Sequence, residues 1–213
     1  MMPRKKDPLE WDFRNYVQNK YSVIPKNDLQ KNLDGLLELV EFSRDKSHNA
    51  KAVLDQAARK IFRLFGFSEI AVGLKSPIDG LYRYEVFFGY SKQLEASYRQ
   101  LKYTPEDMVD PEKFPFVKTG RISELDAAEG FMEEDRHLYD RPLVAGSPRK
   151  SFEDFTEGDY MDVWMYDESK NLIGWFELSK PADGKMPSCD TVRWVEVYVE
   201  VCSLIVSRKQ RGA

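Results

Sequence analysis

The chain contains 213 residues, of which 42% are hydrophobic and 13% aromatic. That apolar content supports a packed core and argues against global disorder. A formal net charge of -4 argues against a nucleic-acid-binding surface. The sequence also has no apolar signal-peptide core and no uncharged run of the ~20 residues that span a bilayer. We therefore expect a cytoplasmic protein that engages neither nucleic acid nor membrane.

Two helices are predicted near the N-terminus. Asn27 or Asp28 can cap a helix over residues 29–44, in which apolar residues recur at spacings of four, three and four, at Leu29, Leu33, Leu36 and Val40. Gly35 interrupts this pattern and indicates a close helix contact. A second helix over residues 50–65 ends before a glycine, which is a common C-terminal stop.

Apolar runs separated by turn residues indicate two β-hairpins, with strands over residues 69–74, 81–90, 160–166 and 172–179. A short helix is predicted over residues 92–101. Prolines interrupt residues 102–157, where we expect short helices and an edge strand near Phe114–Lys118.

A long helix is predicted over residues 188–208, because its polar residues recur at spacings of three and four. Two apolar stripes flank them: Val192, Val195, Val199, Cys202 and Val206 form one, and Trp194, Tyr198, Val201 and Ile205 form the other. A sheet can cover one stripe, so the other needs a partner. The helix over residues 29–44 can supply it within the chain, from a second subunit, or both. We expect a homodimer whose interface includes Leu29, Leu33, Leu36, Val40, Val195, Val199, Cys202 and Val206; the alternative is a monomer in which the two helices cover each other.

These elements predict an α+β fold, with an antiparallel sheet, long N- and C-terminal helices on one face and an irregular helical segment over the other. Residues 26–210 form a single domain in this interpretation. Residues 1–25 are charged and non-periodic, which indicates a tail or a docked arm.

Four features in the second half of the chain follow one another in a characteristic order. Trp164-Met165 ends a strand, an acidic turn covers residues 167–171, Ile173-Gly174-Trp175 begins the next strand, and residues 181–188 link to the last helix. With the helices and strands before them, these features make residues 29–208 similar to a GAF domain. The resemblance implies a sensory or regulatory module that binds a small molecule between the sheet and the middle segment, and that signals through helices to a partner protein.

No cofactor follows from the resemblance, because no motif of a better-known GAF branch is present. The Asn-Lys-x-x-x-Phe-x-x-x-Asp-Glu pattern of cyclic-nucleotide binders does not occur. A mid-domain cysteine followed by histidine, as bilin binders have, is missing, and so are the mid-domain cysteines of the methionine sulfoxide reductase branch. No haem motif is recognised, and the ligand is therefore an unidentified small molecule.

Strand alternation indicates which residues line the pocket. Met161, Val163 and Met165 suit the helix face, as do Leu172, Gly174, Phe176 and Leu178 on the next strand. The opposite face then carries Asp162, Trp164, Tyr166, Ile173, Trp175 and Glu177. In the predicted strand over residues 81–90, Tyr82, Tyr84, Val86 and Phe88 share one face. Arg83 and Glu85 lie on the other face of that strand and are further candidates for the pocket. Aromatic walls with carboxylates favour an organic ligand that is cationic or hydrogen-bonding. The alternative is that Trp164 and Trp175 merely roof the sheet.

The sequence gives little support for catalysis. It has two histidines, no glycine-rich phosphate loop and no Ser/His/Asp order, so we expect neither an enzyme nor a metal site. Two alternatives to the sensor remain: a ligand-free dimerisation scaffold, and a thiol-based redox sensor or reductase that uses Cys189 or Cys202.

Overall fold

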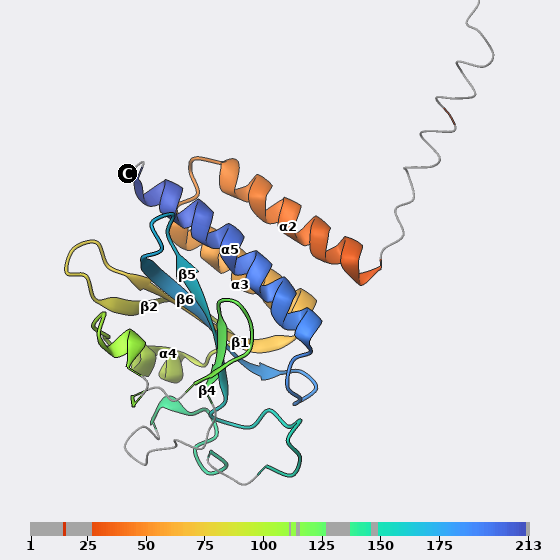
Figure 1. The fold of residues 1–213 in the computed structure, drawn as a ribbon, viewed down its shortest axis with the longest axis vertical. Coiled ribbons are helices and arrows are strands. Elements are labelled where there is room, and N and C mark those ends of the chain that lie inside the picture. The colour runs from red at the N-terminus through yellow and green to blue at the C-terminus, as the bar shows by residue number, and fades with distance from the viewer. Residues whose placement is uncertain are drawn as a thin grey trace, which may run out of the picture.

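The computed structural model describes residue 15 and residues 27–110, 112–113, 116–126, 137–145 and 149–211. Its helices are α2 (Asp28–Arg44), α3 (Ala50–Phe65), α4 (Lys92–Tyr98) and α5 (Cys189–Arg211), with a short 3-10 helix, η1 (Asp107–Val109). Its strands are β1 (Phe67–Lys75), β2 (Tyr82–Phe88), β3 (Val117–Lys118), β4 (Ser123–Asp126), β5 (Tyr160–Tyr166) and β6 (Leu172–Pro181). They form one antiparallel sheet in the order β2-β1-β6-β5-β4-β3 (Figure 1). The arm predicted over residues 1–25 lies outside the described residues, apart from Asn15.

The two N-terminal helices begin at the predicted capping residues, whereas α4 ends three residues earlier than predicted and α5 three residues later. The Asn27 side chain accepts a hydrogen bond from the Gln30 amide at 2.8 Å, and Asn49 accepts one from the Ala52 amide at 2.9 Å. α3 ends at Gly66, whose φ of +74° is a left-handed conformation that glycine adopts without strain.

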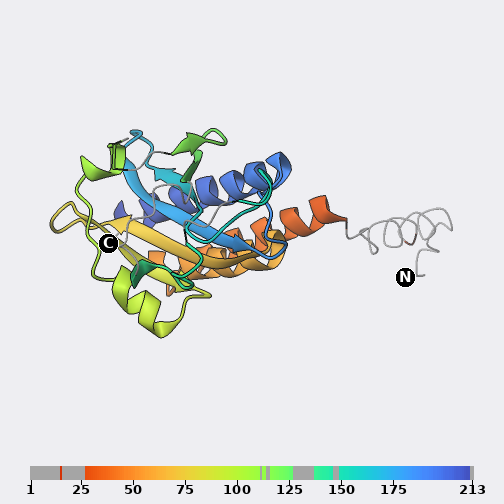
Figure 2. The same ribbon diagram turned by 90° about the horizontal axis from the view of Figure 1, so that it is seen from below.

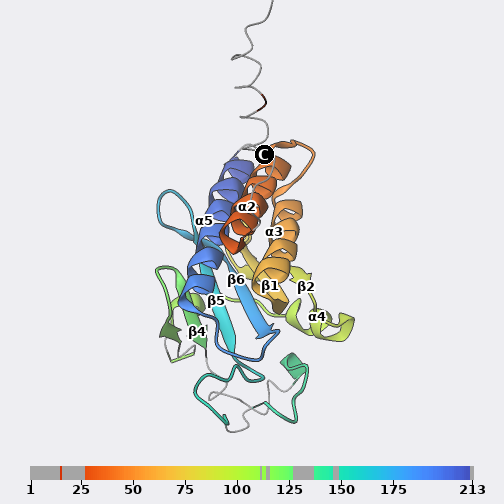
Figure 3. The same ribbon diagram turned by 90° about the vertical axis from the view of Figure 1, so that its right-hand side faces the viewer.

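The helices α3 and α5 cover one face of the sheet, and α4 lies against the other (Figure 2). α2 lies over α3 and α5 (Figure 3). We call the face opposite α3 and α5 the far face. The main core lies between the sheet and α3 and α5, and it includes Met161, Val163 and Met165 as predicted. This arrangement confirms the predicted α+β class. No helix of the described residues is long and apolar enough to cross a bilayer.

The contact predicted at Gly35 joins α2 to α5. A Cβ atom added at Gly35 would lie 2.4 Å from the Tyr198 hydroxyl and 2.8 Å from Leu64 Cδ1. The same hydroxyl donates a hydrogen bond to the Asn32 carbonyl at 2.8 Å. Only glycine allows this close approach of the two helices. α2 therefore covers part of the second apolar stripe of α5, the stripe that contains Tyr198, within the same chain.

The structure corrects half of the predicted dimer interface. Each of Val195, Val199, Cys202 and Val206 is 0% exposed, because this stripe of α5 packs on the sheet of its own chain. These residues are therefore not available to a second copy. Among the predicted interface residues of α2, Leu29 and Leu33 are exposed, while Leu36 packs partly against the core and Val40 is half-buried.

Two β-bulges change which residues share a face. Val72 pairs with Val86 and Gly73 with Tyr84, so Glu85 has no partner on β1. The alternation reverses there: Tyr82 and Tyr84 lie on the far face, whereas Val86 and Phe88 contact the helix-side core. The single face predicted for these four residues was wrong for this reason.

The second bulge lies in β6. Met165 pairs with Gly174 and Tyr166 with Leu172, which leaves Ile173 unpaired. Ile173 consequently packs into the helix-side core and Leu172 against the far face, the reverse of the prediction.

The strand β4 was not predicted, because Ser-Glu-Leu-Asp has little β-propensity. A buried carboxylate on α5 holds it in place. Glu196 Oε1 accepts hydrogen bonds from the Ile122 amide at 2.8 Å and the Ser123 hydroxyl at 2.9 Å. β4 then pairs with β3, which lies within the edge strand predicted near residues 114–118; Phe114 itself lies outside the described residues.

Candidate functional site in the far face of the sheet

The far face carries a second core made largely of aromatic side chains. Its buried members are Ala71, Tyr82, Tyr84, Leu94, Tyr98, Met108, Trp164 and Trp175. α4 and the chain after it cover these residues. Tyr84 lies at the centre, with its ring centroid 4.9 Å from that of Trp175 and 5.0 Å from that of Tyr98.

Both predicted tryptophans lie on the far face, but they are packed rather than open. Trp175 is 2% exposed and Trp164 is 8% exposed. The Trp164 indole donates a hydrogen bond to Glu124 Oε2 at 2.9 Å. These two residues therefore form a wall of the aromatic core. Their burial favours the alternative that both indoles cover the sheet and do not line an open pocket.

The carboxylates next to this wall form a row across the sheet. Glu124 on β4 pairs with Asp162 on β5, and Asp162 pairs with Glu177 on β6. Residues directly opposite in an antiparallel sheet share a face and hold their Cβ atoms about 4.5–5.5 Å apart. We call Glu124, Asp162 and Glu177 the carboxylate row. The structure thus brings the predicted residues Asp162 and Glu177 together.

Glu177 is 6% exposed and lies among tyrosine hydroxyls. It accepts hydrogen bonds from Tyr84 and, at 3.3 Å, from Tyr90. Burial favours the neutral acid and outweighs these hydrogen bonds, so the pKa of Glu177 rises to about 7. The side chain can therefore exchange a proton near neutral pH.

Asp162 has a different environment. Its Oδ1 atom is enclosed and has no hydrogen-bond partner among the described residues, although the residue as a whole keeps part of its surface open. Burial, and then the charge of Glu177, raise the pKa of Asp162 well above its usual range. Asp126, whose pKa burial also raises, lies on the same face of β4, two residues beyond Glu124.

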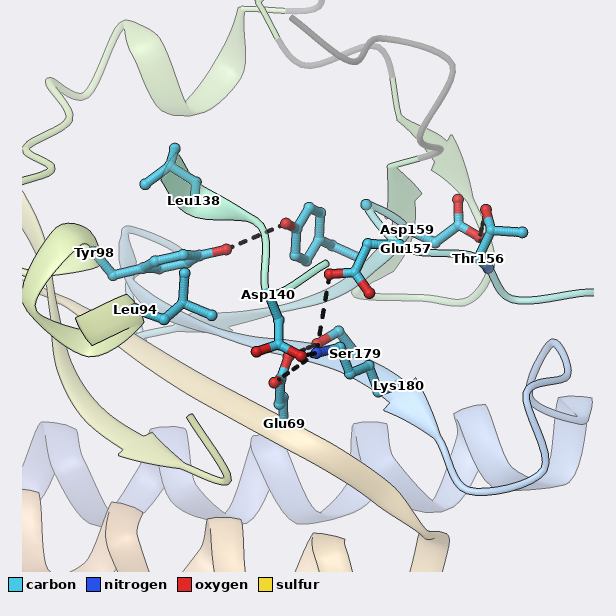
Figure 4. A pocket seen from close by; sticks show the side chains of 12 residues that line it. Glu69, Leu94, Tyr98, Leu138, Asp140, Thr156, Glu157, Asp159, Ser179 and Lys180 are labelled. Carbon is cyan, nitrogen blue, oxygen red and sulfur yellow. Dashed lines mark hydrogen bonds and ion pairs between the residues drawn. The ribbon is translucent and has the colours of Figure 1, made fainter. Parts of the chain in front are cut away.

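A pocket adjoins this region, where residues 137–140 pass over the ends of β1 and β6 (Figure 4). The Tyr98 and Tyr160 hydroxyls lie 3.3 Å apart on one side of it. On the other side, Lys180 Nζ contacts Glu69 at 2.8 Å and Asp140 at 2.7 Å. The void amounts to about 10 Å³, which is about the room that one water molecule needs. The pocket is therefore closed in this conformation.

The remaining predicted site residues lie elsewhere. Arg83 forms an ion pair with Asp79 at 2.5 Å, and Glu85 lies 3.4 Å from Lys51 of α3, on the helix side. Tyr166 lies at the end of β5 and is 37% exposed. The structure brings none of these three into the carboxylate row.

Sequence reasoning missed several residues that surround the row. Glu124 belongs to a strand that was not predicted. Tyr84 was predicted to share one face with Val86 and Phe88, and the bulge in β2 places it on the other. Tyr90, Tyr98 and Tyr160 come from three separate segments. The one sequence signal for them was the density of tyrosines next to the predicted strands.

The two cysteines differ in exposure. Cys189 is exposed at the start of α5 and Cys202 is buried, and burial raises the pKa of the Cys202 thiol to about 12. A raised pKa disfavours the reactive thiolate. In the described part of the chain, no group of three or more histidine, cysteine, aspartate or glutamate residues could hold a metal ion.

No protein-family model matches this sequence, and no curated protein matches it. Solved structures do resemble its fold. The GAF domain of an Acinetobacter phosphoenolpyruvate-protein phosphotransferase gives a TM-score of 0.55 at 12% identity, over 85% of this chain and 95% of that chain. A GAF domain/HD domain protein from Geobacter sulfurreducens gives 0.54 at 16% identity, over 76% and 94% of the two chains. The bacteriophytochrome RpBphP3 from R. palustris gives 0.55 at 12% identity, over 90% of this chain and 39% of that chain. This chain therefore has a GAF-like fold.

Proposed function

We propose that this chain is a sensory or regulatory module that binds a small organic molecule at the far face and passes the bound state on through its helices. The observation that carries the proposal is a pair of acids on the far face. Glu177 is buried and accepts hydrogen bonds from two tyrosine hydroxyls, and Asp162 lies opposite it with an enclosed Oδ1 atom that has no partner among the described residues. Buried ionisable groups of this kind concentrate at functional sites. Proteins with a similar fold include the GAF domain of a sensor histidine kinase from Pseudomonas syringae and part of a methyl-accepting chemotaxis protein.

Ligand entry requires the pocket to open. Residues 137–140 form part of its cover, and the ion pair of Asp140 with Lys180 ties that cover to the end of β6. Asp140 is partly exposed, so this tie is weak enough to break. Lys180 also has a φ of +52°, a left-handed conformation that non-glycine residues seldom adopt. Breaking the tie would release the cover, while Lys180 keeps its ion pair with Glu69 of β1.

The same strand leads to the signalling helix. Glu177 and Lys180 lie on β6, and only residues 182–188 separate this strand from α5. A ligand that moves the end of β6 therefore acts on the N-terminus of α5 through a short connection.

The outer helices offer a surface for a second copy. α2 exposes Leu29 (57%), Leu33 (39%) and Leu37 (61%), and α5 exposes Val197 (41%) and Leu204 (48%). We define these five residues as the outer apolar surface. Leucines at intervals of four along one helix suit a helix–helix seam in a symmetric dimer. Leu37, which the sequence pattern did not single out, replaces Leu36 as the central residue of the proposed interface.

Sedimentation equilibrium of a variant with one charged residue in the interface tests the proposed dimer. We expect a dimer at tens of micromolar wild-type protein and a monomer for Leu37→Glu. Ile78→Glu is the matched control, because Ile78 is 94% exposed in a hairpin turn, away from the helices. A monomeric wild type, or a Leu37→Glu variant that stays dimeric, would refute this interface.

Native mass spectrometry of freshly purified protein tests ligand binding, since it reports a retained molecule together with the oligomeric mass. A second candidate function is a ligand-free scaffold, which the burial of both far-face indoles favours. A protein that carries no small molecule, and whose far-face signals respond to none in NMR titrations, would favour the scaffold.

A further inference from the structure

The carboxylate row is an arrangement that an antiparallel sheet normally avoids. Its three acids lie on neighbouring strands in direct register, one opposite the next. Like charges directly opposite each other destabilise a sheet, and burial strengthens their repulsion. A proton or a cation between the carboxylates would remove this cost.

Asp162, the middle acid, is the one that lacks a donor. Glu124 accepts a hydrogen bond from Trp164 and Glu177 accepts one from Tyr84, but Asp162 Oδ1 is enclosed and unpartnered within the described ranges. A buried acceptor without a donor destabilises the folded protein, and more so when it is charged. Asp162 as a whole is only half-buried, so a donor can approach this residue from its exposed side.

The described basic residues of the chain do not supply that donor. Lys180 binds Glu69 and Asp140, and Arg149 binds Asp159. Across the described ranges, no lysine or arginine forms an ion pair with any acid of the carboxylate row. Where a cation rather than a proton balances the row, that cation therefore comes from outside these residues.

The surroundings favour an organic cation over a metal ion. The described acids do not converge as metal ligands. Aromatic rings adjoin the row instead, with Tyr84 in contact with Glu177, and Trp175 and Tyr98 packed on Tyr84. Aromatic faces attract organic ammonium groups, and a carboxylate accepts their N–H hydrogen bonds.

We infer that the far face binds a molecule with a protonated amine, which donates to Asp162 and Glu177 while its organic part lies against the tyrosine rings. This inference rests on the proposed small-molecule function and adds the chemical class of the ligand. Asp162 is the anchor of the site, because among the three acids of the row it is the one with an enclosed oxygen that lacks a donor within the described residues.

Three probes of one size and different charge test the inference: benzylamine, benzyl alcohol and benzoate. NMR titration of the ¹⁵N-labelled protein follows the indole signals of Trp164 and Trp175, with Trp194 on α5 as an internal reference. We expect benzylamine to shift the two far-face signals with a Kd at least about tenfold below those of the other probes, which is ~1.4 kcal/mol of discrimination.

Two variants test whether Asp162 causes the preference for benzylamine. Asp162→Asn keeps the shape of the side chain and removes the charge, so the preference for benzylamine should fall to about twofold or less. Asp190→Asn is the matched control, because Asp190 is exposed in the first turn of α5. It should keep the full preference. The ranking of the three probes on the wild type tests the inference even if Asp162→Asn fails to fold.

The outcomes separate the two proposals. If the probes bind equally, if benzoate binds most tightly, or if Asp162→Asn keeps the preference, the amine inference is wrong while small-molecule binding stands. If no probe binds, the exact mass of any molecule retained in native mass spectrometry decides, since a molecule without an amine overturns the inference. No binding and no retained molecule would overturn the sensor function as well.

Discussion

The buried acid Glu177 gives a pH dependence of stability whose sign can be worked out. The change is Glu177→Gln, which removes the charge and keeps an oxygen to accept the Tyr84 hydrogen bond. In the folded protein burial raises the pKa of Glu177 from 4.5 to about 7. The folded state therefore binds this proton more tightly than the unfolded state, and the free energy of unfolding falls as pH rises from about 4.5 to about 7.

The size of the effect follows from the difference between the two pKa values. Each unit corresponds to about 1.36 kcal/mol, so Glu177 should remove on the order of 3 kcal/mol of stability between pH 4.5 and pH 8. Glu177→Gln should lose most of this dependence and should be the more stable protein at pH 8. The contributions of Asp162 and Asp126 should remain, because burial also raises the pKa of these two acids.

Other ionisable groups face Glu177 from the elements around it: Asp162 and Tyr160 on β5, Asp126 on β4, Glu69 on β1, Tyr84 on β2, Tyr90 before α4 and Tyr98 on α4. The tyrosines stay protonated across the range tested, since burial raises the pKa of Tyr84, Tyr90, Tyr98 and Tyr160 well above 10. Among these groups, only the acids therefore contribute to the slope.

Urea denaturation followed by tryptophan fluorescence at pH 5, 6, 7 and 8 measures the effect. Glu85→Gln is the control, because Glu85 is a partly exposed acid of β2 beside Lys51. It should follow the wild type. Parallel curves for wild type and Glu177→Gln would refute the reasoning, because they would mean that Glu177 has the same proton affinity in the folded and unfolded chain.

Two further substitutions test the packing that positions the site. Gly35→Ala should destabilise the protein by about 1–3 kcal/mol, because its Cβ would lie 2.4 Å from the Tyr198 hydroxyl. Thermal unfolding measures this loss in the wild-type and Tyr198→Phe backgrounds, and the loss should be smaller in the second, where the hydroxyl is absent. The same loss of stability in both backgrounds would contradict the clash. Glu196→Ala should cost about 1–3 kcal/mol, since it leaves the Ile122 amide without its acceptor. Hydrogen exchange should then show faster exchange at β4, with β1 unchanged; unaltered protection of β4 would argue against this role of Glu196.

The sequence by itself determined the type and order of most elements. Local signals are sufficient where the chain interacts with itself over a few residues, as at the Asn27 and Asn49 caps and the Gly66 stop. Periodicity of three and four identified the long α5 despite its valines, and it identified Gly35 as a point of close contact. The motif order over residues 151–188 indicated the GAF-like fold without support from any family model.

Tertiary structure decided which side chains meet. Two bulges, at Glu85 and Ile173, reversed the alternation of β2 and β6, and neither leaves a local signal because a bulge depends on the partner strand. The choice of the apolar stripe of α5 that faces the sheet was likewise a matter of packing, since both stripes are equally apolar in sequence.

The candidate site shows this division most clearly. Asp162 and Glu177 were predicted to share a face, but the carboxylate row needs Glu124 as well, from a short strand that exists because Glu196 on a distant helix holds it. Burial then raises the pKa values of Asp162 and Glu177. Register and burial are properties of contacts between segments far apart in the chain. The sequence pattern could therefore identify Asp162 and Glu177, but only the assembled sheet places Glu124 beside them.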